Sequence, residues 1–383
     1  MKKRAIFAMT GVLCMALFSA CGTEDTSSAA SDTQQEISIV EVEDLAAAQS
    51  GSETETEAET EATHEGEARS DLTGEWIDEE LAAQRPFAVM IGNTKIATPQ
   101  YGIGSADIIY EAPVEGSETR LMAFFQDYQS VEKIMSIRSC RLYYIDWALE
   151  FDAIYGHYGQ AYLAEDMLSQ SYVDNLNGLE GQLENIMYFR DSSKNAPHNA
   201  YTTGAGILQG ISLKGYAIQH DADYESHYQF NEDDENEITL TDGVAALVVQ
   251  PGYLVNKPWF VYNAGTGLYE RYQNSAEQID ALTDEQLTVK NILIQVCDWY
   301  TANTDTGYLD VETIGSGTGW YVTNGQAIPV TWTKASQTGA TRYYDSAGNE
   351  ITLNQGRTWV CIVQDTYEDN ITFYASEEAF SAQ

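Results

Sequence analysis

The sequence predicts a mixed α and β fold, with a helix-covered sheet in its N-terminal part and mostly β-strands in its C-terminal part. Short continuous apolar runs, typical of buried strands, alternate with Gly- and Pro-rich turns after residue 85. Some of these runs are separated by segments with apolar residues at helical spacing. Tyrosine-rich hairpin patterns become frequent after about residue 243. We therefore divide the folded chain into residues 85–243 and 244–383.

Residues 1–20 have the pattern of a lipoprotein signal peptide. Three basic residues, Lys2, Lys3 and Arg4, precede an apolar run that ends at Ala20 and is shorter than the roughly 20 residues of a membrane span. The small residues before Cys21 resemble the lipobox of bacterial lipoproteins, in which the cysteine is lipidated after cleavage. An ordinary secretory signal or an N-terminal membrane helix is the alternative. We expect Cys21 to anchor the protein in the cell membrane, on its outer, extracytoplasmic face.

Residues 21–84 are expected to form a disordered acidic linker that begins at the lipidated cysteine. The stretch GSETETEAETEAT has almost no large apolar residue and cannot bury enough surface to offset the entropy of ordering. Its like charges would keep it extended, as a stalk. A short helix over residues 71–81 is expected to lead into the folded part.

The chain carries 59 acidic and 19 basic residues, for a net charge of −40. This balance argues against nucleic acid as a partner, because Lys and Arg would be needed to neutralise phosphates. Cys140, Cys297 and Cys361 remain after the signal and anchor, without the spacing of metal ligands. A disulfide between two of them is an alternative to buried free thiols. The sequence predicts no metal site and no cofactor.

The expected elements of the N-terminal part follow from apolar runs and their breaks. Strands are predicted over residues 87–91, 107–110, 119–126, 133–137, 153–158 and 186–189. Ser139 is expected to cap a helix over residues 140–151 that buries Leu142, Ile145 and Leu149 on one face. Further helices are predicted over residues 160–170 and, capped by Thr203, over residues 204–214.

The C-terminal part is predicted to consist of strands and hairpins. The pair Asn324-Gly325 between two apolar runs is the strongest hairpin signal. Strands or hairpins are expected over residues 245–250, 259–272, 289–300, 319–333, 342–353 and 358–364.

The segments RPFAVMIGN, SADIIYEAPVEG, TRLMAFFQ, IRSCR, DWALEFDAIYGHYG and APHNAY resemble the YerB-like lipoprotein family of Gram-positive bacteria. The resemblance covers essentially the whole folded part and continues in GRTWVCIV, although Cys140 stands where the family more often has Ala. It implies a mixed α/β layered sandwich. The family is catalogued as a domain of unknown function, so the resemblance implies no reaction.

Candidate binding residues concentrate between residues 111 and 160. Arg120 and Arg138 lie in or beside apolar strands, where a buried guanidinium needs a partner. Either they form an internal ion-pair network, or they bind a ligand that carries a carboxylate or phosphate. The full candidate set is Glu111, Glu115, Arg120, Arg138, Arg141, Asp146, His157, His198 and Asn199.

Two functions are compatible with these residues. The first is an envelope protein that binds a ligand or acts as a scaffold without catalysis, with an envelope glycan, peptide or protein as partner. The second is an envelope hydrolase of glycan or peptide with Glu111 and Glu115 as acid and base, since these carboxylates flank a proline that ends a strand. The sequence contains no nucleophile-elbow motif.

Overall fold

The computed structural model of the chain describes residues 64–221 and 224–382. These residues belong to one compact unit. The signal peptide, Cys21 and most of the predicted linker lie outside the described residues. The helices of the described part are α1 (Glu79–Ala82), α2 (Leu142–Glu150), α3 (Glu165–Leu168), α4 (Gly204–Lys214) and α5 (Glu377–Ser381).

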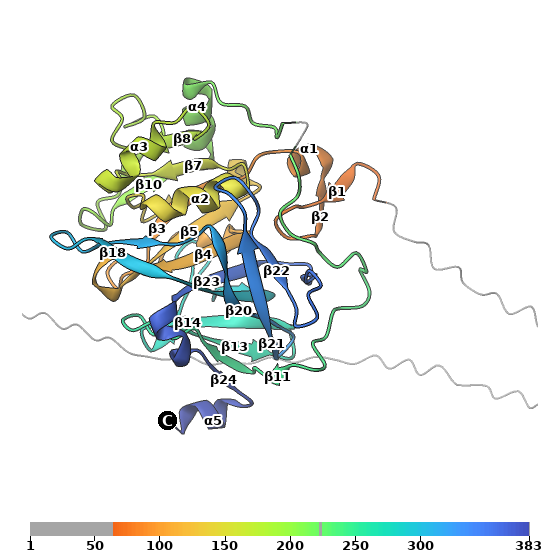
Figure 1. Cartoon of the computed structure of the whole chain (residues 1–383). Coiled ribbons are helices and arrows are strands. Elements are labelled where there is room, and N and C mark those ends of the chain that lie inside the picture. Colours follow the sequence, from red (N-terminus) through yellow and green to blue (C-terminus); the bar gives the residue numbers. More distant parts are fainter. Residues whose placement is uncertain (1–63, 222–223, 383) are drawn as a thin grey trace, which may run out of the picture. The chain divides into compact units, whose positions relative to one another are not determined.

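The largest sheet contains strands from both sides of residue 243 (Figure 1). Its order is β11-β21-β20-β17-β23-β4-β5-β3-β7-β8, and β22 pairs with β21. The central strands β17, β23 and β4 are parallel, and β5 runs antiparallel between β4 and β3. The bounds are β3 (Phe87–Gly92), β4 (Ile108–Pro113), β5 (Thr119–Phe125), β7 (Ile154–His157), β8 (Asn175–Asn177), β11 (Val244–Ala245), β17 (Asn291–Cys297), β20 (Gly315–Thr323), β21 (Gln326–Lys334), β22 (Arg342–Tyr344) and β23 (Thr358–Gln364).

A second sheet belongs to the C-terminal part. Its order is β15-β14-β13-β12-β24, with β16 paired to β14, and its strands are β12 (Val248–Gln250), β13 (Trp259–Asn263), β14 (Leu268–Gln273), β15 (Ala276–Glu277), β16 (Thr288–Val289) and β24 (Thr372–Tyr374). Three smaller groups are β1 (Glu67–Arg69) with β2 (Trp76–Asp78), β6 (Ile134–Met135) with β10 (Ala200–Thr202) and β9 (Phe189–Arg190), and β18 (Trp299–Asn303) with β19 (Tyr308–Val311).

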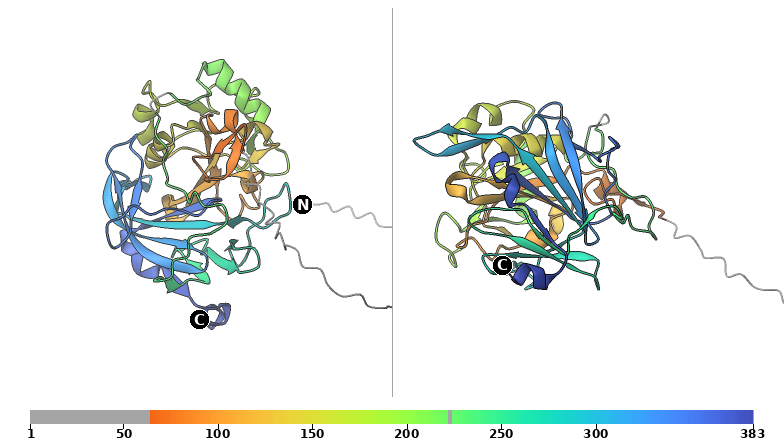
Figure 2. Two further views of the ribbon diagram at one scale, coloured as in Figure 1. Left: turned by 90° about the vertical axis from the view of Figure 1, so that its right-hand side faces the viewer. Right: turned by 60° about the horizontal axis from the view of Figure 1, so that its bottom comes forward.

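Both faces of the large sheet are covered, which makes the fold layered (Figures 1 and 2). Successive residues of a strand point to opposite faces, so Val89 packs with α4 and the second sheet, whereas Met90 packs with α2. Burial on both faces explains why β3, β4, β5, β17 and β23 read as continuous apolar runs rather than alternating ones. The prediction of an α+β layered fold is confirmed.

Helix α2 buries a wider surface than predicted. Tyr143, Tyr144 and Trp147 belong to the core, whereas Leu142 and Leu149 are only half-buried. The expected face was therefore wrong in part, because aromatic residues outweigh leucines in buried area. Ser139 does not cap this helix either: its hydroxyl donates to the Tyr158 carbonyl oxygen, and the N-cap position is Arg141.

Other predictions also need correction. The linker was extended too far, because described residues from His64 onward include β1, β2 and α1, and the helix expected over residues 71–81 is confined to Glu79–Ala82. The expected strand 289–300 is interrupted at Asp298, after which β18 turns into a separate hairpin with β19. Only Arg342–Tyr344 forms a strand within residues 342–353. Thr203 does cap α4, by accepting from the Gly206 amide.

Candidate functional site

A cavity of about 190 Å³ lies at the carboxyl ends of the parallel strands β3 and β4, where β5 begins. Ligands in α/β sheets commonly bind beyond the carboxyl ends of strands. The cavity is lined by Gly92, Asn93, Thr94, Val114, Glu115, Glu118, Thr119, Arg120, Arg138 and His198. Four predicted site residues, Glu115, Arg120, Arg138 and His198, are thus brought together.

Arg120 and Arg138 are the two cationic side chains in the cavity lining. Arg120, on β5, is 7% exposed, and its Nη1 donates to the Ser139 carbonyl oxygen at 2.5 Å. Arg138 follows β6, is half-buried, and its Nη1 lies 3.3 Å from Nδ1 of His198. Neither guanidinium forms an ion pair with any described residue. Burial and the neighbouring charges of Arg141 and Arg138 lower the pKa of Arg120 to about 10, so it stays charged at neutral pH.

Arg138 reaches the cavity by passing close to the backbone of β3. Its amide donates to the Met90 carbonyl oxygen. A Cβ placed on Gly92 would lie only 3.2 Å from Cγ of Arg138. Glycine at position 92 therefore leaves the space through which the arginine stem reaches the cavity.

The nearest carboxylate is neutralised by a third arginine. Glu115 lies in the 3₁₀ turn Glu115–Ser117, and Arg141 at the start of α2 donates to it from Nε at 2.5 Å and from Nη2 at 2.7 Å. Burial would raise the pKa of Glu115, but the hydrogen bonds and charge of Arg141 lower it overall. Glu118 also lines the cavity without an ion pair among the described residues. The cavity lining therefore carries two guanidinium groups and two carboxylates, and one of these carboxylates, Glu115, is already paired with Arg141.

Lys194 adds a positive charge near His198, on the loop before β10. Lys194 Nζ is held by the carbonyl oxygens of Ala97 and Pro99 at 2.7 and 3.0 Å. Burial, Arg138 and Lys194 lower the pKa of His198, which favours its neutral form. A neutral imidazole can donate or accept a hydrogen bond at the rim of the cavity.

Glu111 lies behind the cavity, sealed from solvent. Its Oε2 pairs with Nη2 of Arg271 at 2.6 Å, and both side chains are fully buried. The Arg271 guanidinium lies 4.5 and 4.2 Å from the ring centroids of Phe260 and Trp359. Further donors to the same carboxylate come from Asn93, Thr119, Asn256 and Trp359. Asn93 and Thr119 also line the cavity, so the buried network forms its floor.

Three other predicted residues lie elsewhere. Asp146 accepts a hydrogen bond from Thr313, and burial raises its pKa to about 6. His157 is fully buried, with Nδ1 2.9 Å from the Gly159 carbonyl oxygen, so it reaches no ligand. Asn199 accepts from Nη1 of Arg190.

The proposed acid and base of a hydrolase do not share a site. Glu115 lines the cavity, whereas Glu111 is enclosed in the core and bonded to Arg271. A general acid or base must come within hydrogen-bond reach of the substrate. The arrangement is suited to holding an anion, through two guanidinium groups and the hydroxyl of Thr94. The buried oxygen of Thr94 has no hydrogen-bond partner among residues 64–221 and 224–382.

Sequence reasoning missed Asn93, Thr94, Thr119 and Arg271. Asn93 and Thr94 directly follow the apolar run of β3, and polar residues at a strand end are a usable signal for a site. Arg271 offered no such signal, because it is 160 residues from Glu111.

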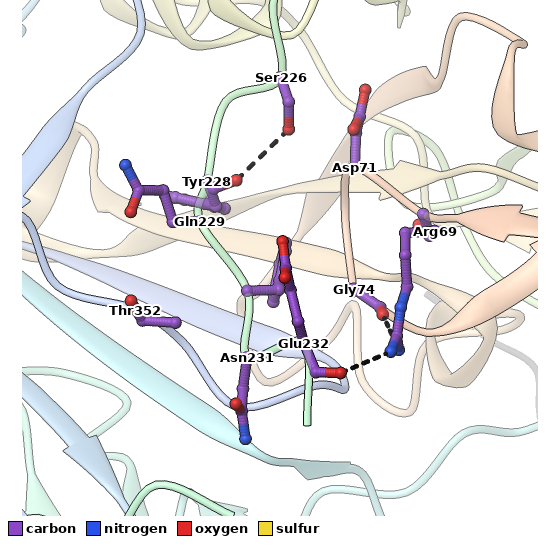
Figure 3. Close-up of a pocket in the computed structure, with 11 residues that line it drawn as sticks. Arg69, Asp71, Gly74, Ser226, Tyr228, Gln229, Asn231, Glu232 and Thr352 are labelled. Atoms are coloured by element: carbon purple, nitrogen blue, oxygen red, sulfur yellow. Dashed lines mark hydrogen bonds between the residues drawn. The ribbon is translucent and has the colours of Figure 1, made fainter. Parts of the chain in front are cut away.

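In two larger hollows the arginines are already paired with groups of the protein itself. One, of about 580 Å³, lies between the β1–β2 segment and residues 226–232 (Figure 3). There Arg69 donates to the carbonyl oxygens of Gly74 and Glu232 and to Asp234. The other, of about 790 Å³, contains Arg85, which is paired with Asp152 and Asp174.

The described residues contain no group of three His, Cys, Asp or Glu side chains placed to hold a metal ion. Cys140, Cys297 and Cys361 are buried free thiols. Burial raises the pKa of Cys140 to about 12, which keeps the thiol protonated and unreactive. No helix in the described ranges is long and apolar enough to cross a membrane.

Comparison with known proteins places the chain among relatives of unknown function. Residues 72–217 match the N-terminal domain, and residues 248–360 the C-terminal domain, of a protein of unknown function, DUF3048. The chain is 27% identical over 297 residues to the "Putative lipoprotein YerB" of Bacillus subtilis (strain 168). The aligned region covers 78% of this chain and 86% of that protein. The crystal structure of the YerB protein from Bacillus subtilis matches with a TM-score of 0.70 at 25% identity, over 80% of this chain and 99% of the other.

Proposed function

The chain belongs to the YerB-like family, and from that premise we propose that it is a lipid-anchored envelope protein that binds an anionic ligand at the Arg120–Arg138 cavity without catalysing a reaction. The lipobox-like sequence before Cys21 and the name of the Bacillus subtilis relative support the anchor. The acidic stretch after Cys21 supports a stalk that holds the folded part on the outer face of a Gram-positive membrane.

One observation supports the binding function: two guanidinium groups share a cavity, and neither has a carboxylate partner in the part of the chain that the structure describes. Burying an uncompensated charge is costly, and Arg120 is 7% exposed. Acidic residues outnumber basic ones by 59 to 19, so partners for these arginines are abundant in the chain. Arg141 has such a partner in Glu115, whereas Arg120 and Arg138 face the cavity. A carboxylate or phosphate would complete the site through the planar fork of donors that arginine offers.

The test is isothermal titration calorimetry of the full-length protein in detergent, with inorganic phosphate and with acetate as the titrants. We expect saturable binding that weakens as salt is added. Replacing Arg138 with Gln should weaken it about tenfold or more, because a hydrogen bond to a charged group contributes about 1.5–3 kcal/mol. Arg138 suits this test because its side chain has a single polar partner among the described residues, His198, so its loss should leave the core intact.

The matched control is Arg342→Gln. Arg342 is also half-buried but is already paired with Glu350 at 3.0 Å, outside the cavity. Its replacement should leave anion binding unchanged. An equal effect of both substitutions, or no saturable binding to either anion, would rule out the site.

A further inference from the structure

An aromatic surface lies beside the anion cavity, on the far side of Arg141. The guanidinium that binds Glu115 on one side lies 5.1 Å from the ring centroid of Tyr308 on the other. Tyr308 begins β19, and the β18–β19 hairpin extends from the C-terminal part toward α2 (Figure 1). The C-terminal part therefore supplies a ring at the edge of a site built by the N-terminal part.

A second ring enlarges this surface. The ring centroid of Tyr162 lies 5.8 Å from that of Tyr308, and the planes are tilted by 46°. Tyr162 is 49% exposed, yet its hydroxyl accepts from Nδ2 of Asn303 at 2.7 Å. The ring is thus held in place from its edge while much of it stays open to solvent. An aromatic ring of this kind offers a rigid apolar face with polar groups around it.

The charge of the hairpin restricts what can lie over these rings. Residues 299–311 contain Asp305 and Asp310 but neither Lys nor Arg. A second anionic group over the hairpin would be repelled, whereas a neutral body would not. The ligand that fits both surfaces has one anionic end, for Arg120 and Arg138, and an uncharged ring-shaped body rich in hydroxyl groups.

We propose that the ligand is an anionic saccharide, whose phosphate or carboxylate occupies the arginine cavity while its sugar ring lies against Tyr162 and Tyr308. This inference rests on the proposed function, because it assumes the anion cavity. The C–H face of a sugar packs on the apolar face of an aromatic ring. The Tyr162 hydroxyl accepts from Asn303, so its own proton can be donated to a sugar oxygen. A long acyl chain would find little apolar surface among the tyrosine hydroxyls and hairpin carboxylates.

The experiment compares five probes on full-length protein in detergent: inorganic phosphate, acetate, glucose 1-phosphate, glucuronic acid and glucose. We expect glucose 1-phosphate to bind about tenfold more tightly than phosphate, or glucuronic acid than acetate, from one added aromatic contact. Whichever of glucose 1-phosphate and glucuronic acid binds more tightly identifies the anionic group as phosphate or carboxylate. Tyr162→Ala should remove this advantage and leave binding of phosphate unchanged, whereas Tyr162→Phe, which keeps the ring, should retain most of it.

Tyr300→Ala is the matched control, because Tyr300 is 51% exposed on the same hairpin and hydrogen-bonds Asp310 instead. It should leave the advantage intact. If both anions bind with the expected dependence on Arg138 but the sugar adds nothing, the saccharide inference is wrong and the anion site stands. If neither the simple anions nor the anionic sugars bind, the proposed function itself fails. Tight binding of glucose alone would also contradict the inference, since the anion would then be unnecessary.

Discussion

At the scale of single residues, the buried ion pair of Glu111 and Arg271 has a high desolvation cost that its surroundings must offset. Removing two charges from water is costly, and the cost is offset only when geometry and extra hydrogen bonds are good. Here the carboxylate receives donors from four further side chains, and the guanidinium lies beside Phe260 and Trp359. Glu111 and Ala112 are adjacent on β4 and point to opposite faces, which places the carboxylate among the residues of the second sheet.

Replacing Arg271 with Met should therefore lower the free energy of unfolding by about 3–5 kcal/mol, because Glu111 would be left buried without its counter-charge. Urea unfolding monitored by tryptophan fluorescence measures this loss. Arg342→Met, which removes a partly exposed pair with Glu350, should cost only about 0–1 kcal/mol. Similar losses in the two variants would show that the buried pair has no special role. In the double variant Arg271→Met with Glu111→Gln, part of the stability should return.

The sequence predicted the arginines of the site better than their partners. Arg120 and Arg138 could be recognised because charged residues stand out in or beside apolar runs. Whether each faces a carboxylate or a cavity depends on side chains far along the chain, as with Arg271 and Glu111. His157 illustrates the opposite error: in an aromatic strand segment, it is buried rather than exposed to a ligand.

At the scale of elements, α2 is fixed at its C-terminal end by a second buried polar group. Glu150 Oε2 accepts from Nζ of Lys334 on β21 at 2.7 Å and from the amide and hydroxyl of Thr341. Its Oε1 accepts from the Tyr110 hydroxyl and lies 3.4 Å from Nε2 of His227. Burial alone would raise the pKa of Glu150, but Lys334 and His227 lower it to about 2.

The low pKa gives a prediction about acid stability. Because the folded-state pKa lies below the unfolded value, Glu150 stabilises the fold above about pH 4.5, and this stabilisation is lost as the pH falls toward 2. The difference in unfolding free energy between the natural protein and Glu150→Gln should shrink over that range. Asp146, on the same helix, has its pKa raised to about 6 by burial, so the difference for Asp146→Asn should instead grow as the pH falls through 6. If the two differences changed with pH in the same direction, the opposite pKa shifts of Glu150 and Asp146 would be contradicted.

The elements themselves were largely predictable, although the first two strands were not. Strands β3, β4, β5 and β23 lie within a few residues of their apolar runs, because burial on both faces leaves no polar alternation to obscure them. The segment β1–β2 was missed, since it is short and follows the acidic stretch without a break in composition. The segment is held in place by tertiary contacts such as the ion pair of Arg69 with Asp234.

At the scale of the whole molecule, the sequence did not predict which strands are neighbours. Strand β23, near the C-terminus, lies between β17 and β4, and its Thr358 is in register with Ile108. When parallel neighbours are separated by so much intervening chain, the local sequence carries no signal for their pairing. Their pairing is decided by packing on both faces of the sheet. The family matches fall on either side of residue 243, yet strands from both sides share one sheet.

This arrangement predicts that residues 85–243 and 244–383 unfold together. If β23 leaves the sheet, β4 loses a parallel neighbour along Ile108–Glu111, and the buried pair of Glu111 and Arg271, which joins the two parts, is exposed at the same time. Urea unfolding should therefore give one transition, with the same midpoint for far-ultraviolet circular dichroism and for tryptophan fluorescence. Fluorine-19 NMR of protein labelled with fluorotryptophan would report on the two parts separately, through the resonances of Trp147 and Trp332, and it leaves Trp359 in place beside Arg271. Distinct midpoints for these two probes would show that the halves are independent domains, and that the shared sheet does not couple them.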